Sequence, residues 1–385
     1  MVSLRQTRGW EAEEVRMFRD SLRRFLEVEA VPNDERWRKQ KRVDREFWEK
    51  AATMGFLCPS MPEEYGGGGG DFRLEAVVSE ELGYANITSF GQQIHGPIVA
   101  HYILHNGTEA QRQHWLPKMC SGEMIAALAM TEPGAGSDLQ GLRTTARRDG
   151  DEYVINGSKI FITNGHNADL ILVACKTDLN AGARGISLVV VETKDLPGFR
   201  RGRNLEKIGM HGSDTAELFF DDVRVPADNL LGCEEGKGFY MMMQELPQER
   251  LVIAAGAQAT MERAVELTIE YTNDRKAFGK RLLDMQLTRQ TLAECYSITQ
   301  ISRAFLDQCI VKHTAGELSA MEASMAKYWC TDKENEVVDK CLQLHGGYGY
   351  MNEYPIARMF VDARVQRIYG GTNEIMKEVI ARSFS

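Results

Sequence analysis

Several common features are missing from this sequence, and each absence narrows the class of protein. No apolar run approaches the roughly 20 residues that a membrane-spanning helix needs, so no membrane insertion is expected. The 385 residues carry a formal net charge of −9, which argues against nucleic acid as a partner because nucleic acids favour a basic surface. Residues 1–6 lead into charged residues without an apolar core, so no secretory signal is expected.

Paired metal ligands and a phosphate-binding loop are also missing. The eight cysteines are scattered and form no Cys-x-x-Cys pair, so we expect no metal centre and free, reduced thiols. This favours a cytoplasmic location, or the mitochondrial matrix for a eukaryotic chain after removal of a transit peptide. Gly66–Gly70 look like a phosphate cradle, but no Gly-Lys-Ser/Thr follows, so an interhelical loop is the better interpretation.

The first third of the chain has a helical pattern. From Val15 to Leu26, apolar residues recur at steps of three and four, which gives a helix one apolar face. Four more segments repeat this period: Phe47–Met54, Glu75–Leu82, Gly96–Leu104 and Ala110–Met119. We therefore predict an N-terminal α-helical domain over residues 1–128.

Near Thr131 the spacing of the apolar residues changes from the helical repeat to an alternation with a period of two residues, which is typical of β-strands. Residues 152–155 and 158–163 read as strands around a tight turn at Asn156–Gly157, because Asn-Gly is a strong hairpin signal. Further strands are predicted at 170–174, 186–191, 216–220 and 223–226. The sequence thus predicts a small antiparallel β-domain over residues 129–237.

Helical periodicity returns at Phe239 and continues to the end. Long segments joined by short turns suggest an antiparallel four-helix bundle, with helices at 251–275, 285–315, 319–344 and 354–367. The predicted fold is therefore α+β and multi-domain, with this bundle over residues 238–385.

The last 20 residues contain a glycine pair that enters a helix. Gly370 and Gly371 allow backbone torsions that other residues avoid, and let a ligand approach closely. Thr372 then reads as the N-cap of a final helix. Taken alone, this motif is better explained as an ordinary loop into a terminal helix.

Two longer segments give that motif a context. Residues 129–141 read Ala-Met-Thr-Glu-Pro-Gly-Ala-Gly-Ser-Asp-Leu-Gln-Gly, and residues 343–362 begin Gln-Leu-His-Gly-Gly-Tyr-Gly-Tyr. Together they resemble the two signature patterns of the acyl-CoA dehydrogenase family, and the resemblance extends from about Glu11 to the C-terminus. It implies helical, β and helical domains in this order, consistent with the periodicities above.

One position departs from that resemblance. Many family members carry the catalytic glutamate directly after the Ile-Tyr of the last motif, where this chain has Gly370. The long-chain and isovaleryl branch carries its base in a Leu-x-x-Glu-Arg-Leu context, which matches Leu246–Leu251. The resemblance therefore implies Glu249 as the base, whereas the local pattern alone fits a solvated Glu249–Arg250 pair. Burial against a flavin and a thioester would raise its pKa and make it a better base.

The resemblance also implies a reaction. The enzyme would be an FAD-dependent acyl-CoA dehydrogenase that forms a trans-2-enoyl-CoA, with the backbone N–H of Gly370 stabilising the developing enolate. Electrons would pass to an electron-transfer flavoprotein, in fatty acid or branched-chain acyl catabolism. The assembly would be a homo-oligomer, most often a tetramer built as a dimer of dimers.

Further site residues follow from the same resemblance. FAD contacts are implied at Met130, Thr131, Ser137, Phe161, Ile162, Thr163, Arg275, Gln286, Gln343, Leu344, His345, Gly346, Gly347, Thr372, Asn373 and Glu374. Substrate contacts are implied at Ser137, Tyr240, Pro247, Gln248, Arg250, Gly370 and Gly371. Gln286 and Gln343–Gly347 would reach the cofactor of a neighbouring subunit.

Alternatives stay open for several of these assignments. His345 fits a cofactor-lining or structural histidine better than a catalytic one, and Phe161 alone fits core packing. A flavin oxidase or monooxygenase would use the same fold, and a scaffold that only binds acyl-CoA would lack a working base. Acyl length and branching depend on pocket walls contributed by several helices.

Overall fold

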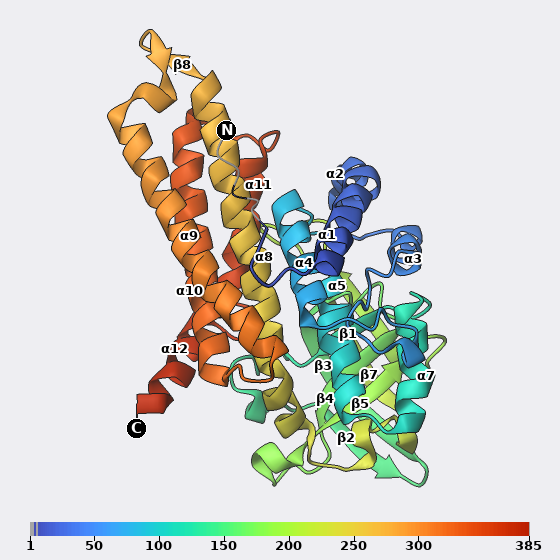
Figure 1. Cartoon of the computed structure of the whole chain (residues 1–385). Helices are drawn as coiled ribbons and strands as arrows, with labels where there is room; N and C mark the ends of the chain where they lie inside the picture. Colours follow the sequence, from blue (N-terminus) through green and yellow to red (C-terminus); the bar gives the residue numbers. More distant parts are fainter. Residues whose placement is uncertain (1–3, 5–6, 385) are drawn as a thin grey trace.

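The computed structural model describes Leu4 and residues 7–384, with a β-sheet placed beside an N-terminal group of helices and a long C-terminal helical bundle (Figure 1). The predicted helix–sheet–helix order is confirmed. The first group comprises α1 (Glu13–Phe25), α2 (Val31–Gln40), α3 (Arg45–Thr53), α4 (Phe72–Ala85), α5 (Gln92–Ile94), α6 (His101–Asn106) and α7 (Glu109–Cys120), with π-helical turns at Leu26–Ala30 and His95–Ala100. The predicted segment Gly96–Leu104 is thus divided between a π-turn and α6.

Helix α1 buries the face that its sequence predicts. Val15, Leu22 and Leu26 are almost completely buried, and they join a core with Trp37 and Trp48. Between Tyr65 and α4, the glycine-rich residues 66–70 form an interhelical loop, as predicted, and its backbone N–H groups bond to residues 58–63.

A buried ionic cluster joins the N-terminal helices to the bundle. Arg19 of α1 donates to Glu80 at 2.7 Å and to Glu81 at 3.0 Å, both on α4. Arg303 donates to Glu262 at 2.9 Å and also to Glu80. Each carboxylate named here therefore has a guanidinium partner inside the protein.

The middle of the chain forms one sheet. Its strands are β1 (Ala126–Ala129), β2 (Thr145–Asp149), β3 (Glu152–Thr163), β4 (Leu170–Lys176), β5 (Ile186–Glu192), β6 (Phe199–Asn204) and β7 (Thr215–Pro226). Among the described residues, the order is β1-β4-β2-β3-β7-β6, with β5 on β4. Most neighbours are antiparallel, but β1 runs parallel to β4, so the sheet is mixed.

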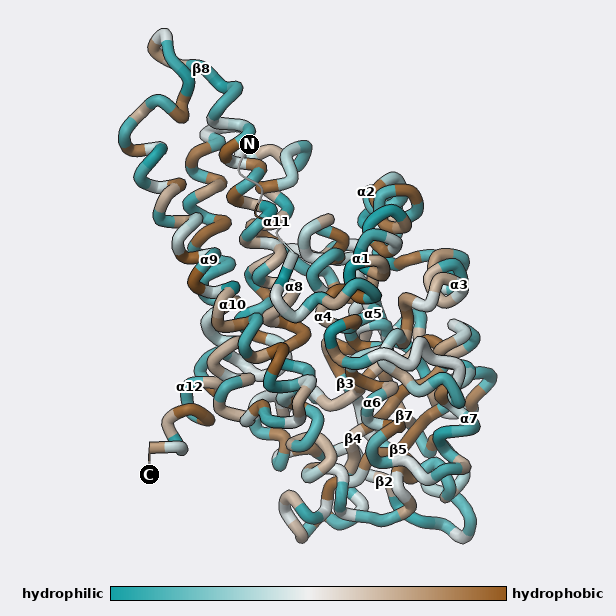
Figure 2. Tube along the Cα trace, viewed as in Figure 1, coloured by the Kyte–Doolittle hydropathy of each residue, from teal (hydrophilic) through white to brown (hydrophobic). Residues whose placement is uncertain are grey.

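Strand β4 is covered on both faces. Leu170, Leu172 and Ala174 belong to the core shared with the helices, whereas Ile171 and Val173 belong to a separate core on the other side. Successive side chains of a strand point to opposite faces, so this uninterrupted apolar run reflects two buried surfaces. Figure 2 shows hydrophobic residues concentrated along these strands.

The predicted turn at Asn156–Gly157 is wrong. These residues lie inside β3, which pairs with β7 on both sides of them. The register shifts between Ile155 and Gly157, as in a β-bulge, which glycine in a strand often marks. The hairpin turn instead lies at Gly150–Asp151, between β2 and β3.

Three long helices dominate the C-terminal part: α8 (Gly238–Asp274), α9 (Gln286–Thr314) and α10 (Ala320–His345). The fourth predicted helix is the short α11 (Pro355–Ala363) with a 3-10 turn at Arg364–Arg367, and α12 (Asn373–Ala381) follows. A small hairpin, β8 (Lys276–Ala277) and β9 (Lys280–Arg281), projects from the end of the bundle (Figure 1). Within the described residues, no helix is long and apolar enough to cross a membrane.

Helix α8 begins 13 residues before the predicted start at Leu251, at Gly238. Pro247 lies in its interior instead of opening it. A proline there leaves the carbonyl of Met243 without its helical donor, but packing on both sides keeps the helix continuous. Glu249 therefore sits within a long buried helix.

Helices α4 and α8 approach closely at two glycines. A Cβ added at Gly83 would lie 2.5 Å from the carbonyl oxygen of Gly256, so a larger residue would force the helices apart. The crossing fixes the position of α8 relative to the N-terminal helices, and hence the position of Glu249.

Candidate active site

Glu249 is buried and hydrogen-bonded to the N-terminal helices. The Tyr102 hydroxyl donates to Glu249 Oε1 at 2.8 Å. The pKa of Glu249 is raised to about 7, chiefly by burial and also by nearby Glu245, while the hydrogen bond from Tyr102 and the charge of Arg250 act in the opposite direction. The side chain is not the solvated surface group that the local sequence pattern allows.

One turn before Glu249 lies a second buried carboxylate, Glu245. His105 Nδ1 lies 2.9 and 3.1 Å from its two oxygens, and the Asn106 side chain donates to it at 3.4 Å. Its hydrogen bond with Glu245 raises the pKa of His105, whose side chain is 41% exposed. A titratable group at the surface is thus coupled to the carboxylate next to Glu249.

Gly370 packs against the same part of α8. Its φ is +62°, and a Cβ added there would lie 2.4 Å from Ile253 Cδ1, one turn beyond Glu249. Any side chain at this position would need both a strained backbone and a displaced Ile253. The backbone N–H groups of Gly370 and Gly371 donate to no other described residue, so both stay available to a ligand.

The segment after the glycine pair is anchored from within. The buried Lys327 of α10 donates to the carbonyl of Gly371 at 2.8 Å and to Asn373 Oδ1 at 2.9 Å. The Asn373 amide group donates to Thr331 and Asp332, so this predicted FAD contact has its side chain turned into the bundle. Thr372 is the N-cap of α12, as predicted, and accepts from the N–H of Ile375 at 3.4 Å.

Arg250 lies between α8 and α10. It donates to Ser324 Oγ at 3.1 Å, and its Nε has no partner among the described residues. Burial lowers the pKa of Arg250, and burial together with Arg250 lowers the pKa of Lys327 to about 7. Neither forms an ion pair with a carboxylate in the described part of the chain, so the site keeps uncompensated positive charge.

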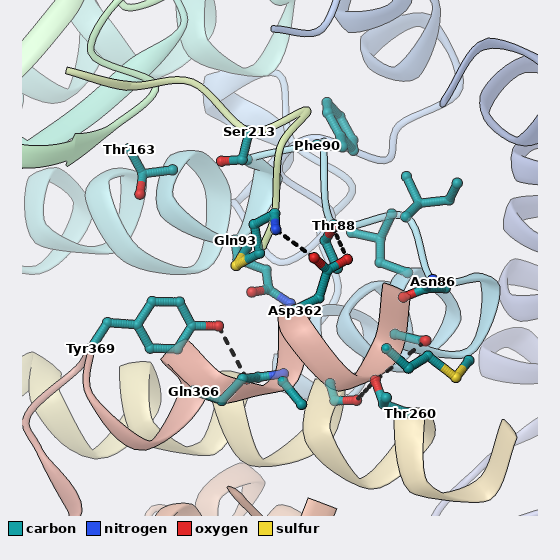
Figure 3. Close-up of a pocket in the computed structure, with 18 of the residues that line it drawn as sticks. Asn86, Thr88, Phe90, Gln93, Thr163, Ser213, Thr260, Asp362, Gln366 and Tyr369 are labelled. Atoms are coloured by element: carbon teal, nitrogen blue, oxygen red, sulfur yellow. Dashed lines mark hydrogen bonds between the residues drawn. The ribbon is translucent and has the colours of Figure 1, made fainter. Parts of the chain in front are cut away.

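A cavity of about 80 Å³ borders Tyr369, the residue that precedes Gly370 (Figure 3). Its wall includes Thr163 of β3, Gly256 and Thr260 of α8, and Tyr369. Residues 249, 253, 256 and 260 follow steps of four, three and four, which places them on one face of α8. Glu249, Ile253 and the cavity wall therefore share this face.

The residues on β3 and beside it suit a flat aromatic cofactor. Phe161 is 64% exposed at a φ of +63°, so a large ring is held uncovered. The N–H of Ile160 donates to the Thr131 carbonyl at 3.0 Å, and Lys159 donates to the Met130 carbonyl at 3.0 Å, which places these residues beside Phe161. Ile162 is buried and Thr163 half-buried. The uncovered ring and the free N–H groups of the glycine pair fit the flavin that the sequence implies.

A second group of predicted cofactor residues lies far away. Arg275 ends α8, 26 residues after Glu249, which at 1.5 Å per residue is about 39 Å. Near that end the structure places Gln286 at the start of α9 and Gln343–Gly347 at the end of α10 (Figure 1). Within one chain, this second group therefore lies far from Glu249.

His345 is held by its own chain. It stacks on Tyr271 with ring centroids 4.3 Å apart, and its Nδ1 lies 2.9 Å from the Cys341 carbonyl. Burial lowers its pKa. These contacts fit the structural interpretation of His345 better than a catalytic one.

The remaining predicted substrate residues differ in exposure. Gln248 is buried, donating to the Pro97 carbonyl at 2.6 Å and lying 2.9 Å from His313 Nε2. Pro247 is half-buried, while Ser137, Tyr240 and the predicted cofactor residue Glu374 are exposed. Gln248 thus braces α8, and the exposed residues are the ones free to meet a ligand.

Sequence reasoning missed several groups that shape the site. Tyr102 and Lys327 lie in segments predicted to be helical, whereas His105 and Glu245 lie just outside such segments, and no motif marked any of the four. The Tyr102–Glu249 contact joins residues 147 positions apart. Only the packing of α6 against α8 brings them together.

Comparisons with known proteins identify the family of the chain. Three family models cover the chain: the acyl-CoA dehydrogenase N-terminal domain matches residues 12–123, the middle domain 127–223 and the C-terminal domain 236–385. The chain is 52% identical to the mitochondrial long-chain specific acyl-CoA dehydrogenase of Sus scrofa, over 95% of this chain and 85% of that protein. It is 36% identical to the mitochondrial isovaleryl-CoA dehydrogenase of Pongo abelii, over 97% and 89%.

A solved structure gives the same picture. The crystal structure of an acyl-CoA dehydrogenase from Geobacillus kaustophilus superposes with a TM-score of 0.96 at 52% identity. The match covers 98% of this chain and all of that one.

Proposed function

The chain belongs to the acyl-CoA dehydrogenase family of FAD-dependent oxidoreductases, and we propose that it dehydrogenates an acyl-CoA to the trans-2-enoyl-CoA with Glu249 as the base. The observation that carries this proposal is the buried Glu249 carboxyl, whose pKa is raised to about 7. A base with a pKa near the working pH is both deprotonated often enough and strong enough to act.

Tyr102 and the buried surroundings of Glu249 contribute to proton removal in different ways. Tyr102 occupies Oε1, which leaves Oε2 to take the proton from C2 of the thioester. Burial makes the carboxylate more basic, and exclusion of water strengthens its interaction with the substrate. Bound FAD supplies the acceptor for the hydride that leaves C3.

The negative charge that develops on the thioester oxygen must be stabilised by hydrogen-bond donors. The free N–H of Gly370 is one, because a backbone donor does not depend on a side chain. The guanidinium of Arg250, which has no carboxylate ion-pair partner in the described residues, favours negative charge near this loop. In this proposal the buried Arg250 acts on the enolate through its charge, and CoA phosphates meet more exposed residues.

The assembly follows from the two separated groups of cofactor residues. Arg275, Gln286 and Gln343–Gly347 would complete the FAD site of a neighbouring subunit in a homo-oligomer, with a dimer of dimers as its full form. Phe278, at the tip of the projecting hairpin, is 94% exposed, which suits a residue covered by another chain. Each chain then supplies the base for one site and the remote contacts for another.

Subunit mixing tests this division. Arg275→Ala and Glu249→Gln each impair one half of a site, and in a mixed dimer one site regains both intact halves. Co-expression in equal amounts should restore about a quarter of wild-type activity per flavin, since random pairing makes half the dimers mixed. If each site lies within one chain, the activity per flavin of the mixed sample is only the average of the activities of the two variants.

An anaerobic titration tests the chemistry. Straight-chain and branched acyl-CoAs of rising length are added to the FAD-loaded enzyme, and the flavin absorbance is followed. We expect bleaching with formation of enoyl-CoA, and reoxidation by an electron-transfer flavoprotein. Binding without bleaching would contradict the proposal and indicate a scaffold, while stoichiometric peroxide release in air would indicate an oxidase.

A further inference from the structure

The loop of Gly370 and Gly371 carries the N–H group that the proposed reaction needs, yet its own backbone gives it little rigidity. Both glycines have a positive φ, +62° at Gly370 and +88° at Gly371, in a region that glycine enters and leaves easily. Neither N–H group donates to another described residue. A donor stabilises developing charge best when it is held in place before the reaction, so contacts from outside the loop are needed to fix it.

Both ends of this loop are held by Asp332 of α10. Its Oδ1 lies 2.6 Å from Arg367 Nε, before the glycines, and accepts from the Asn373 amide group at 2.9 Å, after them. One carboxylate therefore ties the two ends of the loop to the same helix. These contacts fix where the loop begins and ends, but neither is made with the glycines.

Lys327, also on α10, contacts the glycine backbone itself. Its side chain is completely buried, and its Nζ donates to the carbonyl of Gly371 at 2.8 Å. No other described residue donates to that carbonyl. The second acceptor of Lys327, Asn373 Oδ1, also accepts from Thr331 at 3.3 Å, so it has another donor. The contact that depends on Lys327 alone is thus the one with the loop backbone.

An amine in this place is unfavourable for the stability of the bundle. Burial opposes the charged form and lowers the pKa of Lys327 to about 7. A methionine would fill a similar space without the cost of burying a charged or polar group. Strongly perturbed buried groups of this kind gather at functional sites, which indicates a role for the contact with Gly371.

Helix α10 also contacts the residue next to the base. Ser324, three residues before Lys327, accepts from Arg250 at 3.1 Å, and Arg250 follows Glu249 on α8. Side chains three residues apart on a helix have their Cβ atoms about 5 to 6 Å from each other. The segments that carry the base and the donor are therefore both held by one turn of α10, which sets the distance between them.

We propose that Lys327 is a positioning residue, which holds the Gly370 N–H at the thioester oxygen through its hydrogen bond to the Gly371 carbonyl. This rests on the proposed function for the role of Gly370. Lys327 acts through the loop and touches neither the substrate nor the flavin. Without its amine, Asp332 still holds the ends of the loop, while the glycine backbone between them is free to turn its N–H groups away.

The test compares two ligands of the FAD-loaded enzyme that differ at the carbonyl, trans-2-dodecenoyl-CoA and the thioether S-dodecyl-CoA. Only the first has an oxygen that accepts from Gly370, and neither carries a C2 proton and a C3 hydride for the forward reaction. Isothermal titration calorimetry gives the dissociation constant of the thioether divided by that of the enoyl-CoA. Lys327→Met should lower this ratio about fivefold to tenfold, because the enoyl-CoA loses one well-placed hydrogen bond.

Thr331→Val is the matched control. It removes a hydroxyl from the same buried network, one turn further along α10, but keeps the contact between Lys327 and Gly371. Its ratio should stay within about twofold of wild type, since its effect falls on both ligands alike. If Lys327→Met loses FAD, Lys327→Leu, which also lacks a donor, takes its place in the same comparison.

Turnover gives a second measurement. Lys327→Met should lower the rate of flavin bleaching by an acyl-CoA about 10²-fold, with a much smaller change in KM, because the charge on the oxygen is largest in the transition state. An unchanged ratio of dissociation constants in Lys327→Met would overturn the proposal, as would an equal fall in Thr331→Val. If no acyl-CoA bleaches the flavin, the proposed function fails, while the calorimetric ratio still decides the role of Lys327.

Discussion

Two buried glutamates, Glu80 and Glu249, show opposite behaviour in the same fold. Both are buried, yet the pKa of Glu80 is lowered to about 2 while that of Glu249 is raised to about 7. Burial acts in the same direction on both and opposes the charged form. The difference lies in the partners, because Glu80 has the guanidinium groups of Arg303 and Arg19, whereas Glu249 has a tyrosine hydroxyl.

The contrast separates two regions of the molecule. In the ionic cluster of Arg19, Glu80, Glu262 and Arg303, opposite charges are matched, and the cluster joins α1, α4, α8 and α9. Around Glu249 the charges are not matched: Glu245 adds negative charge, and Arg250 forms no ion pair with a carboxylate in the described residues. Paired charges hold the fold together, and unpaired charges keep pKa values near neutrality, where proton transfer is possible.

The largest expected effect is on chemistry, from Glu249→Gln. Removing a general base should lower the rate of flavin bleaching by an acyl-CoA about 10²- to 10⁴-fold. FAD content and thermal stability should stay close to wild type, since the amide is isosteric. Stopped-flow absorbance under anaerobic conditions measures the rate, and an unchanged rate would show that the base is elsewhere.

The matched substitution in the ionic cluster, Glu80→Gln, should act on stability. It leaves buried guanidinium groups with fewer partners, at a cost of about 3 to 5 kcal/mol in the free energy of unfolding. The native pKa of Glu80 is lowered, so its contribution is complete above the unfolded pKa and is lost as pH falls toward 2. Denaturant titrations at several pH values should show the two proteins converging in acid, with bleaching per bound flavin unchanged at neutral pH.

Gly370→Ala tests the packing of the site region, where Gly370 lies against Ile253 of α8. The methyl group meets Ile253 and the backbone keeps an unfavourable positive φ, so a loss of about 1 to 3 kcal/mol is expected. Differential scanning calorimetry measures this loss. Gly134→Ala is a suitable control because a Cβ there meets nothing within 4 Å. Equal melting temperatures for the two variants would contradict the packing of Gly370 on α8.

The smallest effects are two opposite shifts of one pH profile. Tyr102→Phe removes a donor that holds the pKa of Glu249 down, so the acidic limb of kcat/KM should move to higher pH. Glu245→Gln removes a negative charge that raises this pKa, so the limb should move to lower pH. Shifts of about half a pH unit to one unit are expected, and shifts in the same direction would show that these neighbours do not set the basicity of Glu249.

Local patterns predicted much of the fold and failed where tertiary contacts intervened. The apolar stripe of α1 and the buried run of β4 were readable because their periods are strong. Asn156–Gly157 carried an equally strong turn signal, but pairing with β7 converted it into a bulge. The helix predicted from residue 251 begins at Gly238 and includes Pro247, because packing on both sides of α8 keeps it continuous.

The sequence by itself determined the family and pointed to Glu249. The long motifs, and the glycine at position 370 where many family members have a glutamate, can be read from short stretches of sequence. The sequence could not determine the protonation of Glu249 or the hydrogen bond that Tyr102 donates to it. Those properties depend on which groups from distant segments meet in a space closed to water. Electrostatic energies and hydrogen bonds are set by such distances and by burial, and only the tertiary structure fixes either.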